Sequence, residues 1–249
     1  MSQPHNSKVI LEAQGIVKVL GEAPNQAKVL KGIDLQLHTG ELTLLMGPSG
    51  SGKTTLLSIL GCILSPSEGR LTLAGHSTQN VGPEGLADLR RRHVGFIFQG
   101  YNLVPTLTAV ENVMLALDLR DQNGPDAYDN AATALEAVGL GHRIEAMPSK
   151  MSGGEKQRVA IARALAGSPS VILADEPTAA LDGTNGMAVM ELLARVAKDT
   201  QRAVLAVTHD HRTLQYADRI VTIDDGLILK SERPKLETEG VAKTDATAH

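Results

Sequence analysis

The sequence is poor in aromatic residues and in cysteine. Its 249 residues include one cysteine, no tryptophan, two phenylalanines and three tyrosines. A single cysteine cannot form a disulfide within the chain, which excludes a small disulfide-stabilised secreted domain. Free cysteine is often interior, and Cys62 follows an apolar run at residues 56–60, so we expect its side chain to be buried.

Long apolar segments are also missing. No stretch approaches the roughly 18 uncharged apolar residues that a transmembrane helix requires. Residues 1–6 lack the basic and apolar regions of a signal peptide. We therefore expect the chain to stay in the cytoplasm.

Positive charge is not in surplus. The chain has 24 Lys and Arg against 28 Asp and Glu, a formal net charge of -4 at pH 7. A large nucleic-acid-binding surface normally needs an excess of basic residues, so no nucleic-acid partner is expected. The one basic cluster, Arg90 to Arg92, is predicted to be a solvated helix face, with a contact to a partner as the alternative.

What is present is an ordinary globular composition. Hydrophobic residues make up 42% and charged residues 21% of the chain. A chain of this length buries roughly three-quarters of its unfolded surface, as one large domain or two small lobes. There is no internal repeat, so we expect one functional unit rather than a tandem pair.

The hydrophobic pattern predicts two kinds of sheet. Residues 42–46, 171–174 and 203–207 are short and almost continuously apolar, as strands covered on both faces should be. They predict a central parallel sheet. Residues 33–38 alternate apolar and polar, and residues 71–73 continue that style, which predicts an antiparallel sheet near the N-terminus.

Helices are expected between these strands. Residues 88–92 and 130–138 have helical patterns, with a polar break at residues 121–126. A helical lobe is therefore predicted to interrupt the sheet domain.

The C-terminal part contains a hairpin signal. Asp224, Asp225 and Gly226 separate two apolar runs, and glycine accepts a positive φ without penalty. The polar residues 231–249 beyond it are expected to fray.

One glycine-rich segment carries a phosphate-binding pattern. Residues 47–54 match G-x-x-x-x-G-K-[ST] in full, directly after an apolar strand and before a helical run. The glycines let successive N–H groups face one anion, and the helix N-terminus adds partial positive charge. A glycine-rich turn without a ligand is the alternative, but strand, pattern and helix would then coincide by accident. The residues predicted to bind nucleotide are Gly47, Pro48, Ser49, Gly50, Ser51, Gly52, Lys53, Thr54 and Thr55.

Acidic and imidazole side chains follow two of the apolar strands. Asp175 and Glu176 come at the end of one strand, and His209 follows another. Open α/β sheets bind their ligands at this edge. We expect Thr54 and Asp175 to bind Mg²⁺, Glu176 to polarise the attacking water, and His209 to sense or hold the γ phosphate. A surface Asp-Glu pair is the alternative.

Residues 151–158, Met-Ser-Gly-Gly-Glu-Lys-Gln-Arg, resemble the signature sequence of ABC ATPases. Ser152 and Glu155 also form the capping box of a helix, and both interpretations hold together, because a capped helix start is an anion site. The resemblance implies that Ser152, Gly153, Gly154 and Glu155 bind the γ phosphate of ATP held by a second copy of the chain.

The resemblance covers residues 9–230, with the family's motifs in order. Besides those above, it includes Gln99, expected to contact Mg²⁺ or the attacking water, and Leu181-Asp182, expected near the nucleotide. It implies an α/β P-loop fold, with a RecA-like core, an N-terminal antiparallel β-subdomain and an inserted α-helical subdomain. The expected bounds are 8–230 for one domain, about 8–95 and 166–230 for the core, about 96–165 for the helical part, and 231–249 for a polar tail.

Within the family, the chain looks most like the subunits of lipoprotein-release, macrolide-export and heterocyst glycolipid-export systems. This implies an ATPase with ATP and Mg²⁺, dimeric, on the inner face of the cell membrane through an integral-membrane permease, with a periplasmic adaptor beyond it. The alternatives are an ABC ATPase that signals through a membrane partner without transport, as cell-division members do, a soluble ABC protein of DNA repair or translation, and an inactive scaffold. Intact motifs disfavour the last of these.

Two positions depart from the family pattern. Leu20 stands where the relatives usually carry an aromatic residue that stacks on adenine. We therefore expect weak discrimination between bases. Glu155 replaces glutamine in the signature, which keeps an acceptor and the capping geometry but adds charge near a phosphate, and we expect activity to survive it.

Overall fold

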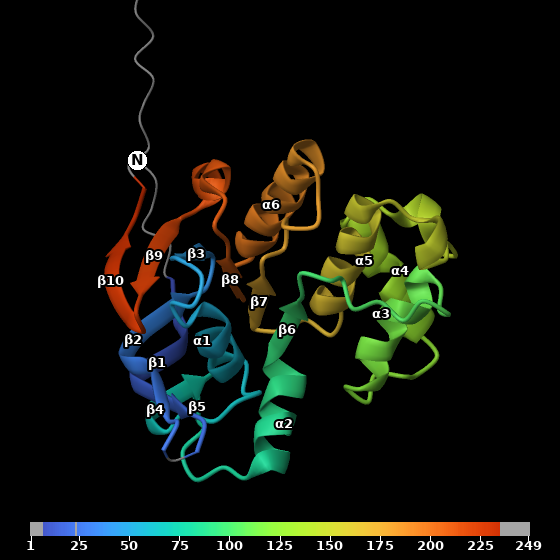
Figure 1. Cartoon of the computed structure of the whole chain (residues 1–249). Coiled ribbons are helices and arrows are strands. Elements are labelled where there is room, and N and C mark those ends of the chain that lie inside the picture. Colours follow the sequence, from blue (N-terminus) through green and yellow to red (C-terminus); the bar gives the residue numbers. More distant parts are fainter. Residues whose placement is uncertain (1–6, 23, 235–249) are drawn as a thin grey trace, which may run out of the picture.

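The protein is described by a computed structural model that covers residues 7–22 and 24–234. Its centre is a six-stranded sheet in the order β10-β9-β3-β8-β7-β6 (Figure 1). The five strands from β9 to β6 run parallel, and β10 is antiparallel at one edge. The strands are β3 (Leu42–Met46), β6 (Val94–Ile97), β7 (Val171–Asp175), β8 (Ala203–Val207), β9 (Arg219–Asp224) and β10 (Leu227–Glu232).

Both predicted sheets are confirmed. All five residues of β3 and of β8 are buried, because layers of structure cover both faces of this sheet. The second sheet is antiparallel, in the order β2-β1-β4-β5, and Ile33, Leu35 and Leu37 of β2 alternate into its buried face. Its strands are β1 (Val9–Leu20), β2 (Ala27–His38), β4 (Glu68–Leu73) and β5 (His76–Ser77).

Three helices form a separate cluster on one side of the sheet (Figure 1). They are α3 (Ala109–Asp118), α4 (Ala127–Ala137) and α5 (Gly153–Leu165), and they contact one another. A predicted helix over residues 130–138 corresponds to α4, and the polar break at 121–126 precedes it. The remaining helices are α1 (Lys53–Leu60), α2 (Pro83–His93) and α6 (Gly183–Ala197), with short 3-10 turns at η1 (Gly141–Arg143), η2 (Pro148–Lys150) and η3 (His211–Tyr216).

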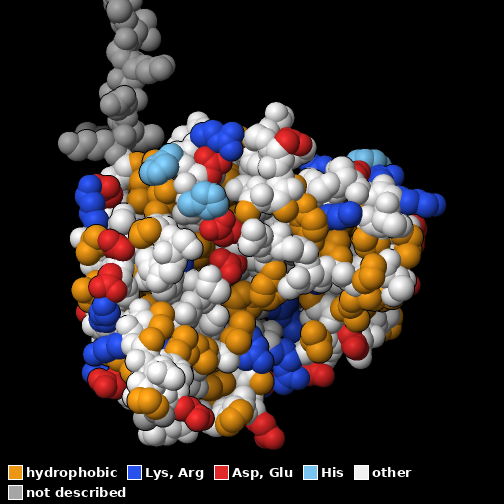
Figure 2. Space-filling view, in the orientation of Figure 1, with side chains coloured by type: hydrophobic (Ala, Val, Ile, Leu, Met, Phe, Trp, Pro, Cys, Tyr) orange, Lys and Arg blue, Asp and Glu red, His pale blue; other side chains and the backbone are white. Residues whose placement is uncertain are grey.

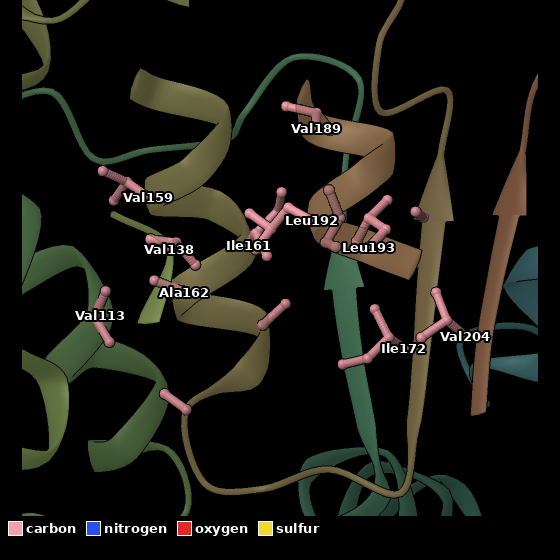
Figure 3. Packing of buried hydrophobic residues seen from close by; sticks show 14 of the residues in the cluster. Val113, Val138, Val159, Ile161, Ala162, Ile172, Val189, Leu192, Leu193 and Val204 are labelled. Atoms are coloured by element: carbon pink, nitrogen blue, oxygen red, sulfur yellow. The ribbon is translucent and has the colours of Figure 1, made fainter. Parts of the chain in front are cut away.

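A continuous apolar core joins the helical cluster to the sheet. Val113 and Val159 of the helices, Leu192 of α6, and Ile172 and Val204 of the strands belong to one buried cluster (Figure 3). Because α5 contacts α3, α4 and β6, it is the element through which the helices pack on the sheet. The helical cluster is therefore attached to the β6 edge of the sheet through α5.

The C-terminal hairpin is confirmed, but the expected start of the tail is wrong. Asp225 and Gly226 adopt positive φ values of 42° and 74° in the turn. Ser231 and Glu232, expected to fray, pair with β9 as the last residues of β10. Polar residues suit this exposed edge strand, and Arg233 just beyond it forms an ion pair with the buried Glu41. Residues 235–249, the rest of the predicted tail, lie outside the described residues.

Two smaller predictions concern Cys62 and the arginine run. Cys62 is buried, with 3% of its surface exposed, as expected. Arg91 and Arg92 are exposed on α2 and pair with Asp88, which confirms a solvated face for these two. Arg90 is half-buried instead and donates to the carbonyl of Cys62.

Across residues 7–22 and 24–234, each helix is too short or too polar to cross a membrane.

Candidate nucleotide-binding site

The predicted phosphate loop lies between the end of β3 and the start of α1. Gly47 packs so closely against the C-terminal hairpin that a Cβ would lie 2.0 Å from the Ile223 carbonyl oxygen. Gly52, at φ 101°, precedes the helix without a side-chain cap, so the first N–H groups of α1 stay available for an anion. The Gly226 N–H donates to the Ser51 carbonyl over 3.1 Å, which braces the loop from the hairpin.

Lys53 is held within this loop. Only 9% of the residue is exposed, and its Nζ donates to the carbonyl oxygens of Gly47 and Pro48 over 2.8 and 2.7 Å. These two bonds orient the ammonium group but do not neutralise it. The loop therefore presents a desolvated positive charge that a phosphate group can match.

Asp175 ends β7, two strands away from β3 in the sheet. Burial, together with the neighbouring Glu176, raises the pKa of the Asp175 carboxyl above its usual range. The Lys53 charge and a hydrogen bond with the Thr54 hydroxyl act in the opposite direction. The Asp175 carboxylate and the Thr54 hydroxyl thus lie next to each other beside the phosphate loop. Two such oxygen ligands suit a hard cation.

Glu176 and His209 are in hydrogen-bond contact at the same edge. The His209 Nδ1 lies 3.0 and 2.8 Å from the two carboxylate oxygens of Glu176. Glu176 has a left-handed φ of 49°, and its N–H donates to the Val207 carbonyl at the end of β8. A left-handed conformation costs a residue other than glycine about 1 to 2 kcal/mol, so neighbouring contacts must hold this carboxylate in place.

A cavity of about 690 Å³ collects most of the predicted residues. Its volume is within the range of small-molecule sites. Pro48 and Ser51 belong to the same loop but do not line it. The lining residues are Leu20, Val29, Gly47, Ser49, Gly50, Gly52, Lys53, Thr54, Thr55, Gln99, Asp175, Glu176, Val207 and His209.

The signature residues do not line this cavity. They start α5, where the Ser152 hydroxyl accepts from the Glu155 N–H over 3.2 Å and the Glu155 carboxylate accepts from the Ser152 N–H over 2.8 Å. This confirms the predicted capping box. The Ser152 N–H bond and the ion pair with Arg143 at 3.0 Å hold the pKa of the Glu155 carboxyl below its usual range. Arg143 thus balances the charge that glutamate adds at this position.

Asp182 lies beside the signature rather than in the cavity. It caps α6, with one carboxylate oxygen 2.9 Å from the Asn185 N–H and the other 2.7 Å from its Nδ2. Gly154 is close by, since a Cβ there would lie 2.8 Å from the Asn185 Oδ1. The first turns of α5 and α6 therefore form one surface, and Ser152 and Asp182 are exposed on it.

A parallel sheet with a glycine-rich loop between strand and helix, and with acids at the ends of neighbouring strands, defines a P-loop nucleoside triphosphatase fold. A family profile described as ABC transporter matches residues 30–179. The chain belongs to this family, which confirms the fold class and the resemblance found in its sequence.

Two similar proteins agree with that assignment. The chain is 40% identical over 221 residues to the lipoprotein-releasing system ATP-binding protein LolD of Pseudomonas fluorescens, covering 89% of this chain and 97% of the relative. It is 42% identical over 227 residues to the macrolide export ATP-binding/permease protein MacB of a Shewanella strain. That match covers 91% of this chain but only 35% of the relative.

Solved structures give the same result. A dimeric ATP-binding cassette in a post-hydrolysis state, bound to ADP and Pi, superimposes with a TM-score of 0.81 at 36% identity. The match covers 90% of this chain and 98% of that one. The protein cbiO1 from Clostridium perfringens, part of the ABC transporter complex cbiONQ, is similar at 28% identity and a TM-score of 0.81.

Some residues at these surfaces carry no local sequence signal. Arg143, which pairs with the Glu155 carboxylate, lies 12 positions before it in the sequence. Tyr101 and Arg163 connect the Gln99 segment to α5, although 62 positions separate them. No motif or periodicity pointed to these contacts, because they depend on how the helical cluster packs.

Proposed function

We propose that the chain is the ATP-hydrolysing subunit of a bacterial ABC transporter that exports a substrate or handles lipids or lipoproteins. Two copies bind two Mg-ATP between them and drive a membrane permease. The observation that carries this proposal is the separation of the two halves of the site. Lys53, Asp175 and Glu176 line one cavity, whereas Ser152 lies on another surface of the same chain.

Nucleotide phosphates fit the loop before α1. Lys53 balances the charge of the β and γ phosphates, and the loop N–H groups with the N-terminus of α1 supply further donors. Leu20 and Val29 line the same cavity and offer an aliphatic surface to the base. Affinity therefore comes mainly from the phosphates.

The oxygen ligands available here suit Mg²⁺. Thr54 and Asp175 are hydrogen-bonded to each other, and Gln99 lines the same cavity. When bound, the ion supplies charge stabilisation to the terminal phosphates. Gln99 is exposed in a loop, so it can move toward or away from the site.

Glu176 is proposed as the general base. Its carboxylate orients an attacking water and withdraws a proton from it. His209 holds that carboxylate through Nδ1, and its exposed ring can turn toward the γ phosphate.

A second copy completes each site. In a head-to-tail arrangement, the capped start of α5 in one protomer faces the nucleotide in the loop of the other, and its free N–H groups bind the γ phosphate. Asp182 lies on the same surface and contacts the partner. The solved relative described as a dimer bound to ADP and Pi supports the formation of a dimer.

The test replaces Glu176 with Gln. Because the amide cannot accept a proton, ATP turnover is expected to fall by about 10² to 10⁴, while Mg-ATP now traps a stable dimer measured by size-exclusion chromatography with light scattering. Glu191→Gln on exposed α6 is the matched control and should keep its turnover within about twofold. Unchanged turnover in the Glu176 variant would remove the assignment of the base.

A groove beside the Gln99 segment is the proposed contact with the permease. It has a volume of about 750 Å³, and Phe98 and Asn102, on either side of Gln99, line it. Leu115 of α3, Leu119 just after the end of α3, and Ile63 contribute exposed apolar side chains. Figure 2 shows Lys and Arg side chains gathered between α2 and α3, with hydrophobic side chains around them.

The charge of this groove fits a partner with apolar and acidic side chains. Burial lowers the pKa of Arg120 and of Arg163, and both donate to backbone carbonyl oxygens. A carboxylate from the partner would compensate this charge. Docking there would place the chain on the inner face of the membrane, with any periplasmic adaptor reached through the permease.

A further inference from the structure

Tyr101 contacts three segments that the proposed function uses separately. Its hydroxyl donates to the Ala180 carbonyl over 3.4 Å, two residues before Asp182. The same oxygen lies 2.9 Å from the position that a Cβ of Gly153 would take. Tyr101 itself follows Gln99 by two residues, and its N–H donates to the Phe98 carbonyl, which closes a turn around Gln99.

The backbone around Tyr101 is held in a costly conformation. Tyr101 and Asn102 have successive left-handed φ values of 62° and 50°. The Arg163 guanidinium of α5 donates to both of their carbonyl oxygens, over 2.8 Å to that of Tyr101. Burial lowers the pKa of Arg163, so these carbonyls are its stabilising partners. The turn after Gln99 is therefore tied to the same helix that begins with the signature.

These contacts form one physical connection. Tyr101 closes the turn that contains Gln99, and its hydroxyl is in contact with the start of α5 and with the segment that leads to Asp182. Both of those segments face the other protomer's nucleotide in the proposed dimer. Coupling between two sites requires such a linked element, whose position both sites affect.

We propose that Tyr101 is a positioning residue, whose hydroxyl links the nucleotide state at Gln99 to the signature and Asp182 surface offered to the partner. This inference rests on the proposed dimeric function. It assigns the coupling to one hydroxyl group, because that oxygen makes both the bond to the Ala180 carbonyl and the close approach to Gly153.

The experiment uses the full chain with Glu176→Gln as parent, with and without Tyr101→Phe. Two quantities are measured: ATP affinity at protein concentrations too low for dimers, and the dissociation constant of the Mg-ATP dimer by analytical ultracentrifugation. Loss of one hydrogen bond in each protomer should weaken the dimer by about tenfold. ATP affinity of the monomer and Tm should stay unchanged, because the hydroxyl contacts neither nucleotide nor core.

Tyr128→Phe is the matched control, since it removes a phenol hydroxyl that donates to Glu145 within the helical cluster. Tyr128→Phe should leave the dissociation constant of the Mg-ATP dimer unchanged. If Tyr101→Phe leaves that constant within twofold of the parent, or lowers Tm and monomer affinity together with it, Tyr101 has no positioning role. A parent that forms no dimer with Mg-ATP would instead overturn the proposed function, and this inference with it.

Discussion

At the scale of single residues, the cavity has an aliphatic side chain at the position where we expect the base to lie. Leu20 is 39% exposed at the end of β1 and lines the cavity together with Val29. An aliphatic surface excludes water from a base but offers neither the stacking of an aromatic ring nor a hydrogen bond to distinguish purines. Discrimination between ATP and GTP therefore has little physical basis in this part of the site.

We predict that GTP competes with ATP within a factor of about ten, a limit that follows from the absence of such contacts. Leu20→Tyr should tighten ATP binding by about 1 to 3 kcal/mol through stacking. Both affinities are measured by competition of ATP and of GTP against a fluorescent ATP analogue. Leu229→Tyr, on the exposed edge strand, is the control. A wild-type preference for ATP well above tenfold would reject the prediction.

At the scale of elements, the segment from Gln99 to α3 depends on one buried amide. Asn112 is fully buried, and its Oδ1 accepts from the Val104 N–H over 2.8 Å. Its Nδ2 donates to the carbonyls of Val104, Leu107 and Thr108. This loop has no helix or strand to satisfy its backbone, so the side chain takes that role.

Asn112→Leu should lower the free energy of unfolding by about 3 kcal/mol, because it leaves several buried backbone groups without a partner. For a chain of this size that corresponds to a fall in Tm of roughly 6 to 12 °C. Thermal unfolding followed by circular dichroism measures it. Asn130→Leu, at an exposed position of α4, should shift Tm by less than about 2 °C, as surface substitutions do. Equal shifts for both variants would contradict the role of Asn112.

Elements with strong local patterns were predictable, and contacts between distant elements were not. Apolar runs identified β3, β7 and β8, and the eight-residue pattern identified the loop before α1. The last residues of β10 escaped prediction because Ser231 and Glu232 are polar, and an edge strand tolerates polar side chains. The pairing of Glu155 with Arg143 escaped it because no periodic signal connects the two positions.

At the scale of the whole molecule, the cavity proposed for nucleotide lies close to the groove proposed for a partner. Phe98 and Asn102 of the groove flank Gln99 of the cavity, so a partner seated in the groove would touch the segment that we propose senses nucleotide. This proximity explains how ATP binding could be converted into movement of a second protein without a long chain of intermediates.

We predict that Leu119→Glu abolishes recovery of a polytopic membrane protein with the ATP-trapped Glu176→Gln chain from solubilised membranes of its source. Leu119 is 69% exposed on the groove, so the charge should block docking without unfolding the chain. ATPase of the isolated Leu119→Glu protein should stay within about twofold of wild type. Leu229→Glu is the control for added surface charge. Recovery of soluble proteins alone with the parent would favour the non-transport alternatives.

The bracing of the phosphate loop by the C-terminal hairpin bears on the order of events during protein synthesis. Ser51 and Gly47 touch Gly226 and Ile223, which leave the ribosome about 175 positions later. The profile match at residues 30–179 does not include this hairpin. A nascent chain can thus contain the whole phosphate motif and still have no finished cradle, so we expect nucleotide to assist folding only after the hairpin at Gly226 has been synthesised. A fragment ending before Arg219 that bound ATP normally would contradict this.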